Sequence, residues 1–310
     1  MKKKNIIPHN YIELLKRLFF LIATLYLVVG CSNNNSIETR DSIYLNIPDI
    51  EFEKKLISLG IDSDSLINHQ ILKREAEQVS TLNLNTIGEN TINNLTGIEG
   101  FVNLKKLSAV GNHLTTVNLK FNTQLDTLNL AGNYITTIDL SNNTELIKVD
   151  LNTNELNSIT GLKNATKLKW LNLSSNLLEA LSIHNPALET LFVKNNLLMS
   201  LDVQKAVSLT TILAQTNKIS EVDFMANIAL ETLALSDNNL QNINMESNSN
   251  IEVFYCSSNL LTSLDISGLE NLVRLTVDRN PNLFCVKIHN GQNISNLIKS
   301  DYQELNTNCN

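Results

Sequence analysis

The sequence predicts a β-rich solenoid, a fold in which short coils of chain stack on one another around a shared core. Three observations support this prediction. An asparagine recurs at intervals of 20 to 22 residues, the same apolar pattern surrounds each copy, and apolar residues two positions apart recur in every copy, as in a short strand with one buried face. Hydrophobic residues make up 43% of the 310-residue chain but aromatic residues only 5%, so the core is expected to be aliphatic.

The recurring asparagines are nine in number, and successive intervals between them are 21, 21, 22, 20, 21, 21, 21 and 21 residues. They are Asn112, Asn133, Asn154, Asn176, Asn196, Asn217, Asn238, Asn259 and Asn280. A side-chain amide offers two donors and an acceptor to backbone groups that no regular ladder satisfies where the chain turns out of a strand. We therefore expect a structural asparagine ladder rather than a ligand site.

The segment LDTLNLAGNYITTIDL (125–140) shows the apolar frame of one coil. Leu128 and Leu130 are two residues apart, so both point inward from one short strand. A single coil cannot bury these leucines, but stacked coils can share one continuous core. The frame L-x-x-L-x-L-x-x-N-x-L resembles the leucine-rich repeat from about residue 79 to residue 288. The resemblance implies a curved parallel sheet on the concave side and, for function, protein recognition.

Only about ten residues follow each asparagine before the next coil begins, which leaves no room for a helix of ordinary length. The convex side is therefore expected to be short extended or 3₁₀ segments. The coil between Asn154 and Asn176 is one residue longer and contains NELNSITGLKNATKL. This coil resembles the internalin style of repeat, in which a 3₁₀ turn covers the back.

Both ends of the repeats (79–284) are expected to be capped, because a solenoid exposes its core at each end. At the front, IPDIEFEKKLISLGID, within an N-terminal cap at 47–78, places Phe52, Leu56 and Leu59 on one helical face. At the rear, the C-terminal cap (285–310) contains Cys285 and Cys309, for which we predict a disulfide. Cys256 occupies a leucine position and is expected to be a buried thiol.

The N-terminus has the features of a secretory signal: basic residues, a short apolar run from Leu18 to Val29, and the ending V-V-G-C. This ending resembles the lipobox of bacterial lipoproteins, which implies cleavage after residue 30 and lipidation of Cys31. The alternative is an unusually short membrane anchor. Residues 31–46 would form a lipidated, flexible tether. Cleavage would remove five basic residues and one acidic residue, changing the net charge from −7 to −11. Cap and lipobox together resemble surface lipoproteins of Bacteroidota, which implies the outer membrane or cell surface.

Side-chain parity predicts which residues of each strand face outward on the concave sheet. The middle column runs Ser108, Asn129, Asp150, Asn172, Phe192, Leu213, Ala234, Tyr255 and Thr276. The apolar stretch from Phe192 to Tyr255 would span roughly 15 Å at the spacing of neighbouring strands. Trp170, the one tryptophan of the chain, stands one strand from Phe192 and one column over. We predict that Trp170, Phe192, Leu213, Ala234 and Tyr255 bind a ligand. The alternative is that these residues only stabilise the sheet.

Other classes of function are disfavoured by composition and motif. A negative net charge lacks the footprint of a nucleic-acid-binding protein. The histidines are scattered and no catalytic or metal-binding motif stands out, so we expect neither an enzyme nor a cofactor. Asp62 and Asp64 invite a calcium site, but Leu66 and Ile67 stand where such a loop needs an oxygen ligand and glycine, so a solvated loop is expected.

The sequence therefore predicts a membrane-anchored binding protein without chemistry of its own. Its expected partner is a host or envelope protein. Two alternatives stay open: a carbohydrate-binding lipoprotein, in which the aromatic residues would stack on sugar rings, and a purely structural component of the envelope.

Overall fold

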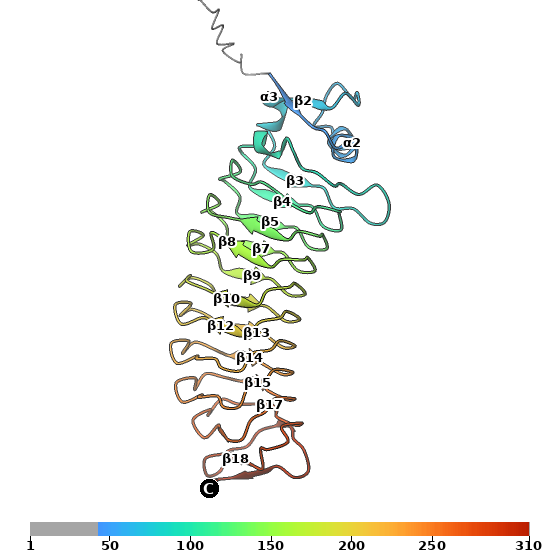
Figure 1. Ribbon diagram of the computed structural model, residues 1–310. Helices are drawn as coiled ribbons and strands as arrows, with labels where there is room; N and C mark the ends of the chain where they lie inside the picture. Colours follow the sequence, from blue (N-terminus) through green and yellow to red (C-terminus); the bar gives the residue numbers. More distant parts are fainter. Residues whose placement is uncertain (1–42, 310) are drawn as a thin grey trace, which may run out of the picture. The chain divides into compact units, whose positions relative to one another are not determined.

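The computed structural model describes residues 43–309, and the chain from Tyr44 onward forms one compact unit of stacked coils (Figure 1). The signal sequence (1–30), the lipidation site Cys31 and most of the tether lie outside the described residues. The end of the predicted tether is ordered, because Tyr44–Asn46 forms strand β1, which pairs antiparallel with β2 (Gln70–Leu72).

Eleven short parallel strands, one from each successive coil, form a continuous sheet along the stack. They are β3 (Thr81–Asn83), β4 (Lys106–Ser108), β5 (Thr127–Asn129), β7 (Lys148–Asp150), β9 (Trp170–Asn172), β11 (Thr190–Phe192), β13 (Thr211–Leu213), β14 (Thr232–Ala234), β15 (Val253–Tyr255), β17 (Arg274–Thr276) and β19 (Asn296–Ile298). We refer to the solvent-facing side of this sheet as the sheet face and to the opposite side of the coils as the back. The solenoid prediction is confirmed.

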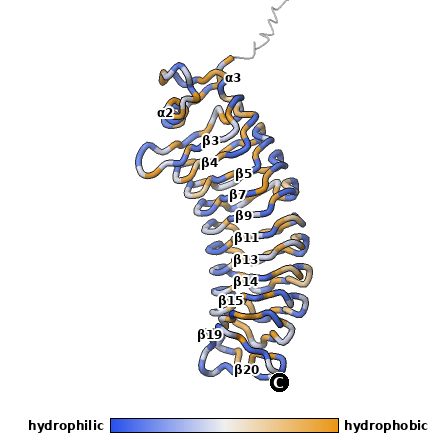
Figure 2. The backbone as a smooth tube through the Cα atoms, turned by 180° about the vertical axis from the view of Figure 1, so that it is seen from behind, coloured by the Kyte–Doolittle hydropathy of each residue, from blue (hydrophilic) through white to orange (hydrophobic). Residues whose placement is uncertain are grey.

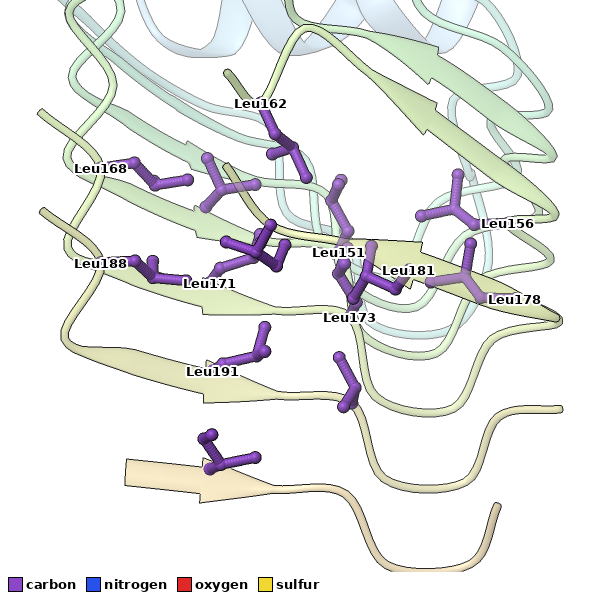
Figure 3. Close-up of a cluster of buried hydrophobic side chains, with 14 of the residues drawn as sticks. Leu151, Leu156, Leu162, Leu168, Leu171, Leu173, Leu178, Leu181, Leu188 and Leu191 are labelled. Atoms are coloured by element: carbon purple, nitrogen blue, oxygen red, sulfur yellow. The ribbon is translucent and has the colours of Figure 1, made fainter. Parts of the chain in front are cut away.

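The apolar frame read from the sequence forms the core. In the coil that begins at Leu125, the inward residues are 0 to 4% exposed. They are Leu125, Leu128, Leu130, Ile135, Ile138 and Leu140. Figure 3 shows how leucines of successive coils fill the interior, with Leu168 and Leu188 on one side, Leu156 and Leu178 on the other, and Leu171 and Leu191 between them. Figure 2 shows apolar positions recurring from coil to coil. Burying each such leucine contributes about 1.5 to 3 kcal/mol.

Each asparagine of the ladder connects two coils. The Asn133 Nδ2 donates to the carbonyl oxygens of Ala109 in the preceding coil (2.9 Å) and Leu130 in its own coil (2.9 Å). Its Oδ1 accepts from the Leu114 amide at 3.1 Å. Eight of the nine ladder asparagines are buried and Asn217 is half-buried. The ladder therefore satisfies backbone groups that the sheet leaves without partners.

The residue before each ladder asparagine has a left-handed backbone. Glycine occupies this position in two coils (Gly111, φ 71°; Gly132, φ 67°), but the later coils place other residues there. Those residues are Thr153, Ser175, Asn195, Thr216, Asp237, Ser258 and Arg279, with φ between 53° and 57°. Left-handed backbone is costly for residues with a Cβ, so the turn is held by the surrounding bonds rather than by local preference.

A second column of asparagines lies at the outer turn that leads back into each strand. The Asn227 Nδ2, for example, donates to the carbonyl oxygens of Val203 (3.0 Å) and Ala206 (2.8 Å) in the preceding coil. The members that are no more than 1% exposed are Asn122, Asn143, Asn185, Asn227 and Asn248. This column was not predicted from the sequence, although 21-residue intervals separate Asn122 from Asn143 and Asn227 from Asn248.

The back carries shorter parallel ladders of extended chain. They are β6 (Thr137–Asp139) with β8 (Ser158–Thr160), β10 (Ala180–Ser182) with β12 (Ser200–Asp202), and β16 (Leu264–Asp265) with β18 (Cys285–Lys287) and β20 (Glu304–Asn306). Of the two kinds of segment predicted for the convex side, extended and 3₁₀, the structure has the extended kind. The coil between Asn154 and Asn176 carries strand β8, where a 3₁₀ turn was expected.

The N-terminal part contains helix α2 (Ile50–Ser58), the short helix α3 (Lys73–Ala76) and a 3₁₀ helix, η1 (Ile98–Gly100). The Asp49 carboxylate caps α2, because its Oδ1 accepts from the amides of Glu51 and Phe52, each at 3.0 Å. Its Oδ2 accepts from the Asn93 and Asn94 amides at 2.7 and 2.9 Å, which ties the helix to the segment before the regular coils. Phe52 and Leu56 are buried, whereas Leu59 lies past the last helical turn and is exposed.

At the C-terminal end, strand pairing continues past residue 284, since β19 extends the main sheet and β20 extends the last ladder of the back. The disulfide between Cys285 and Cys309 is confirmed, with a Cα–Cα distance of 5.7 Å. It connects β18 to the segment after β20 and fastens the last coil to the stack. Within residues 43–309, no helix is long and apolar enough to cross a membrane.

Candidate functional site

The predicted ligand-binding residues form a row on the sheet face, which we call the aromatic row: Trp170, Phe192, Leu213, Ala234 and Tyr255. Strand register pairs Phe192 with Leu213, Leu213 with Ala234, and Ala234 with Tyr255. The inward neighbours of these residues in the strands are fully buried leucines, isoleucines and phenylalanines. Parity therefore directs the row to the solvent side, as the alternation of strand side chains requires.

Trp170 and Phe192 begin the row. Their ring centroids lie 5.5 Å apart with an interplanar angle of 79°, which is an edge-to-face contact. The Lys148 Nζ lies 4.5 Å from the centroid of the Trp170 ring, close enough for a cation–π interaction. Both rings are half-buried. The pair is thus held in a defined geometry before any partner arrives.

Leu213, Ala234 and Tyr255 continue the row over the next three strands. Leu213 and Tyr255 are half-buried, but Ala234 is fully buried. The prediction that the Ala234 side chain is exposed on the sheet face is therefore wrong. Its single methyl group lies between larger side chains on the two adjacent strands, and a partner would rest on those instead. The Arg274 guanidinium donates to the Tyr255 hydroxyl oxygen at 3.2 Å. A cation therefore stands at each end of the row, Lys148 at one and Arg274 at the other.

Ile298 extends the same column and was missed. Strand β19 pairs Ile298 with Thr276, which in turn pairs with Tyr255 on β15. The Ile298 side chain is 57% exposed. Pro281 and the shifted leucine at 283 hid this strand, because they break the repeat frame from which the other columns were counted. The alternation N-L-I at 296–298 was the remaining signal.

The surroundings of the row are polar. Thr190, Thr211 and Thr232 form the neighbouring column, in register across β11, β13 and β14. Exposed glutamates precede three strands of the row: Glu189, which pairs with the Lys169 ammonium at 2.7 Å, Glu231 and Glu252. An apolar row with charged and hydroxyl-bearing neighbours has the layout of a protein-binding hot spot and its rim.

Ser182, His184 and Asp202 are of the residue types used in nucleophilic catalysis, but they are not arranged for it. The Ser182 Oγ and the Asp202 Oδ2 lie 3.2 and 3.6 Å from the same ring nitrogen of His184, Nε2, whereas a nucleophilic triad uses both ring nitrogens. Burial raises the pKa of the Cys256 thiol, which opposes formation of the nucleophilic thiolate. In the part of the chain that the structure describes, no group of three or more His, Cys, Asp or Glu side chains is placed to hold a metal ion.

The loop that holds Asp62 and Asp64 is exposed at residues 63–67, as expected, but Asp62 itself is buried. The side chain is 2% exposed, and its pKa is raised to about 6 by burial and by the nearby carboxylates of Asp64, Glu75 and Glu53. The Asp64 carboxylate instead holds the loop, accepting from the Leu66 amide at 2.8 Å and the Asn68 side chain at 3.0 Å. These contacts give the loop a structural role.

No protein-family model matches this chain, and no curated protein matches it. Solved structures do. The functional domain of InlJ from Listeria monocytogenes, which includes a cysteine ladder, is 22% identical with a TM-score of 0.57 and covers 84% of this chain and 72% of that chain. The LRIM1/APL1C complex gives 24% identity and a TM-score of 0.58, covering 75% and 47%. The leucine-rich repeat domain of APL1B gives 21% and 0.52, covering 69% and 61%.

These likenesses establish the class of fold: the chain folds as a leucine-rich repeat solenoid, similar to an internalin of Listeria. At such identities the likeness concerns the fold alone, so the function has to be argued from the sheet face.

Proposed function

We propose that this chain is a non-catalytic binding protein that recognises a partner protein through the aromatic row of its sheet face. The observation that carries the proposal is the edge-to-face pair of Trp170 and Phe192, which continues over adjacent strands to Leu213 and Tyr255. Trp and Tyr are enriched among the residues that dominate binding energy. The LRIM1/APL1C structure, itself a complex, is compatible with this use of the fold.

The row is preorganised for binding. Its strands belong to a continuous hydrogen-bonded ladder, and Lys148 and Arg274 restrain the rings at its two ends. A rigid surface loses little conformational entropy on association, so more of the contact energy remains as affinity. The polar rim would exclude wrong partners while the rings supply most of the binding free energy.

A protein partner is favoured over a glycan by the position of Lys148. A sugar ring stacks on an open aromatic face, but the Lys148 ammonium lies over the Trp170 ring at 4.5 Å. The edge contact with Phe192 limits access further. A protein side chain or loop can instead pack along the row and offer a carboxylate to the cation.

We also propose that lipidation of Cys31 anchors the chain to the outer membrane or cell surface, with the partner in the envelope or on a host. The support is the V-V-G-C ending after a short apolar run. Replacing Cys31→Ser should move the protein from the membrane fraction to the soluble fraction of the cells that produce it. Membrane retention of that variant would contradict the anchor without bearing on the aromatic row.

The binding test compares three baits made from residues 32–310, which include the whole compact unit. One is unmodified, one carries Trp170→Ser, Phe192→Ser and Tyr255→Ser, and the control carries Phe121→Ser and Tyr134→Ser. Phe121 and Tyr134 are 53% and 47% exposed and lie outside the row. The baits are exposed to envelope and host-cell extracts.

We expect the triple variant to lose at least about tenfold of the captured partner, because hot-spot truncations typically cost 2 kcal/mol or more. The control should capture as much as the unmodified bait. Equal capture by all three baits would refute the row as the binding site and favour a structural role. Capture of a glycan instead of a protein, lost in Trp170→Ser, would favour the carbohydrate alternative.

A further inference from the structure

The ladder on the back is interrupted between strands β8 and β10. These strands belong to adjacent coils, since β7, β9 and β11 pair in succession in the main sheet. On the back, β8 pairs only with β6 and β10 only with β12. In the described part of the chain, this is the one place where back strands of adjacent coils face each other without pairing.

The interruption coincides with a change in coil length. The coil from Asn154 to Asn176 has one residue more than the common 21, and the next has one fewer. The extra residue is accommodated at Gly161, whose φ is 83°. A Cβ there would lie 2.1 Å from the Ser141 amide nitrogen, so only glycine lets the longer coil fit against its neighbour. The interruption of the back ladder thus coincides with the insertion and the following deletion.

The two facing strand edges present backbone groups without partners. The Leu140 amide donates to Thr160 O and the Ile183 amide to Asp202 O. These two bonds show which residues of each back strand direct their backbone groups toward the paired strand and which direct them away from it. In a parallel ladder, alternate residues direct both backbone groups to the same side. Ile159 of β8 therefore directs its amide and carbonyl toward β10, and β10 directs Ala180 O and the Ser182 amide toward β8. No strand pairing among the described residues uses these four groups.

A groove of about 590 Å³ lies between these edges. Apolar side chains of the two coils line it, with Leu162 and Leu181 among the buried leucines drawn in Figure 3. Its hydroxyl-bearing lining residues are Ser141, Ser158, Thr160 and Ser182. Each edge is three residues long, about 10 Å of strand, so the groove suits a short extended segment.

A carboxylate stands behind each wall of the groove. The Asp139 Oδ1 accepts from the Thr160 hydroxyl at 3.0 Å, and the Asp202 Oδ2 accepts from the Ser182 hydroxyl at 2.8 Å. Hydrogen bonds from Ser141 lower the pKa of Asp139, and the bond from Ser182 lowers the pKa of Asp202. Both groups are therefore ionised at neutral pH. No lysine or arginine of the described chain pairs with either.

We propose that this groove binds an extended segment of a partner polypeptide, which adds as a strand to the edges of β8 and β10 and places a lysine or arginine near Asp139 and Asp202. Unpaired backbone donors and acceptors on facing edges match the backbone of an added strand. The Asp139 carboxylate has no cationic partner in the described chain and Asp202 faces only His184, at 3.6 Å, so both favour a basic side chain. This second site is independent of the aromatic row, and either can fail without the other.

The test selects peptides from a phage-displayed library of random eight-residue sequences on residues 32–310, and then measures binding of the enriched peptides as synthetic compounds. We expect alternating apolar residues and at least one Lys or Arg. Methylating single peptide amides should weaken binding about tenfold or more at the successive positions that lie between the two edges and not at the peptide ends, because neighbouring residues of the added strand bond alternately to β8 and β10. Asp139→Asn with Asp202→Asn should weaken basic peptides by about tenfold.

Hydrogen exchange locates the peptide. Its binding should slow exchange of the Ile159 and Ser182 amides and leave the sheet face unchanged, and the triple variant of the aromatic row should bind the same peptides with unchanged affinity. No enrichment above background would overturn the proposal. So would protection of amides elsewhere, or binding that is indifferent to methylation at every position. Loss of binding in the aromatic-row variant would assign the peptides to the first site instead.

Discussion

Replacing Asn133→Ala tests the ladder that joins the coils. The substitution removes two donated hydrogen bonds, to the carbonyl oxygens of Ala109 and Leu130, and one accepted from the Leu114 amide. Asn133 is 5% exposed, so water does not replace the lost partners. Leaving a buried polar group without a partner costs about 1 to 3 kcal/mol.

For the three groups together we expect the free energy of unfolding to fall by about 3 to 5 kcal/mol, since the effects share one site and are not fully additive. That loss is a large part of the 5 to 15 kcal/mol by which a typical domain is stable. The assay is urea unfolding followed by the fluorescence of Trp170, the one tryptophan of the chain, together with circular dichroism of the whole chain.

The matched control is Asn142→Ala, nine residues later in the same coil, because Asn142 is exposed and makes no side-chain hydrogen bond in the described structure. It should change stability by no more than about 0.5 kcal/mol. A loss below about 1 kcal/mol for Asn133→Ala, or a loss equal to that of the control, would refute the idea that the ladder satisfies otherwise orphaned backbone groups. A smaller slope with urea would instead indicate that neighbouring coils unfold separately.

Three further changes probe the turn, the cap and the C-terminal end. Thr216→Gly should stabilise the chain by about 0.5 kcal/mol, because Thr216 has a φ of 55° and glycine relieves that strain at some entropic cost. Thr211→Gly, within strand β13, should destabilise the chain, and a change of the same sign in the free energy of unfolding for both variants would contradict the role of backbone strain. Because burial raises the pKa of Asp62 to about 6 in the folded state, its stabilising contribution is full below about pH 3 and is lost as the pH rises through 6 to about 7. The free energy of unfolding should therefore fall by about 3 kcal/mol over that range relative to Asp62→Asn, and parallel pH profiles would exclude this linkage. Cys285→Ser with Cys309→Ser should cost about 3 kcal/mol, and reducing agent should destabilise the native chain but not this variant.

The sequence predicted most of the sheet, because side-chain parity and a repeat of near-constant length leave little freedom. Leu128 and Leu130 are buried and Phe192 and Tyr255 share one column for that reason. Exposure within the column was harder to predict. Ala234 is covered by its larger neighbours, and burial of so small a side chain depends on packing rather than on parity.

Two features of the chain could not be predicted from the sequence. The break between β8 and β10 is one of them, because counting the intervals shows that two coils differ in length but not that their back strands fail to pair. The loop is solvated at residues 63–67 as expected, but Asp62 is buried, and its pKa is raised by that burial and by carboxylates that include Glu75 of α3 and Glu53 of α2. Such clusters carry no local pattern.

Whether the aromatic row contacts a partner can be measured by site-specific photo-crosslinking in the cells that produce the protein. A photoreactive phenylalanine analogue is placed at Phe192 in one variant and at Phe121 in another, since both are phenylalanines and Phe121 lies outside the row. If the row binds a partner protein, we expect a discrete protein adduct from position 192 and none of the same size from position 121. No adduct from 192, or the same adduct from both positions, would contradict it.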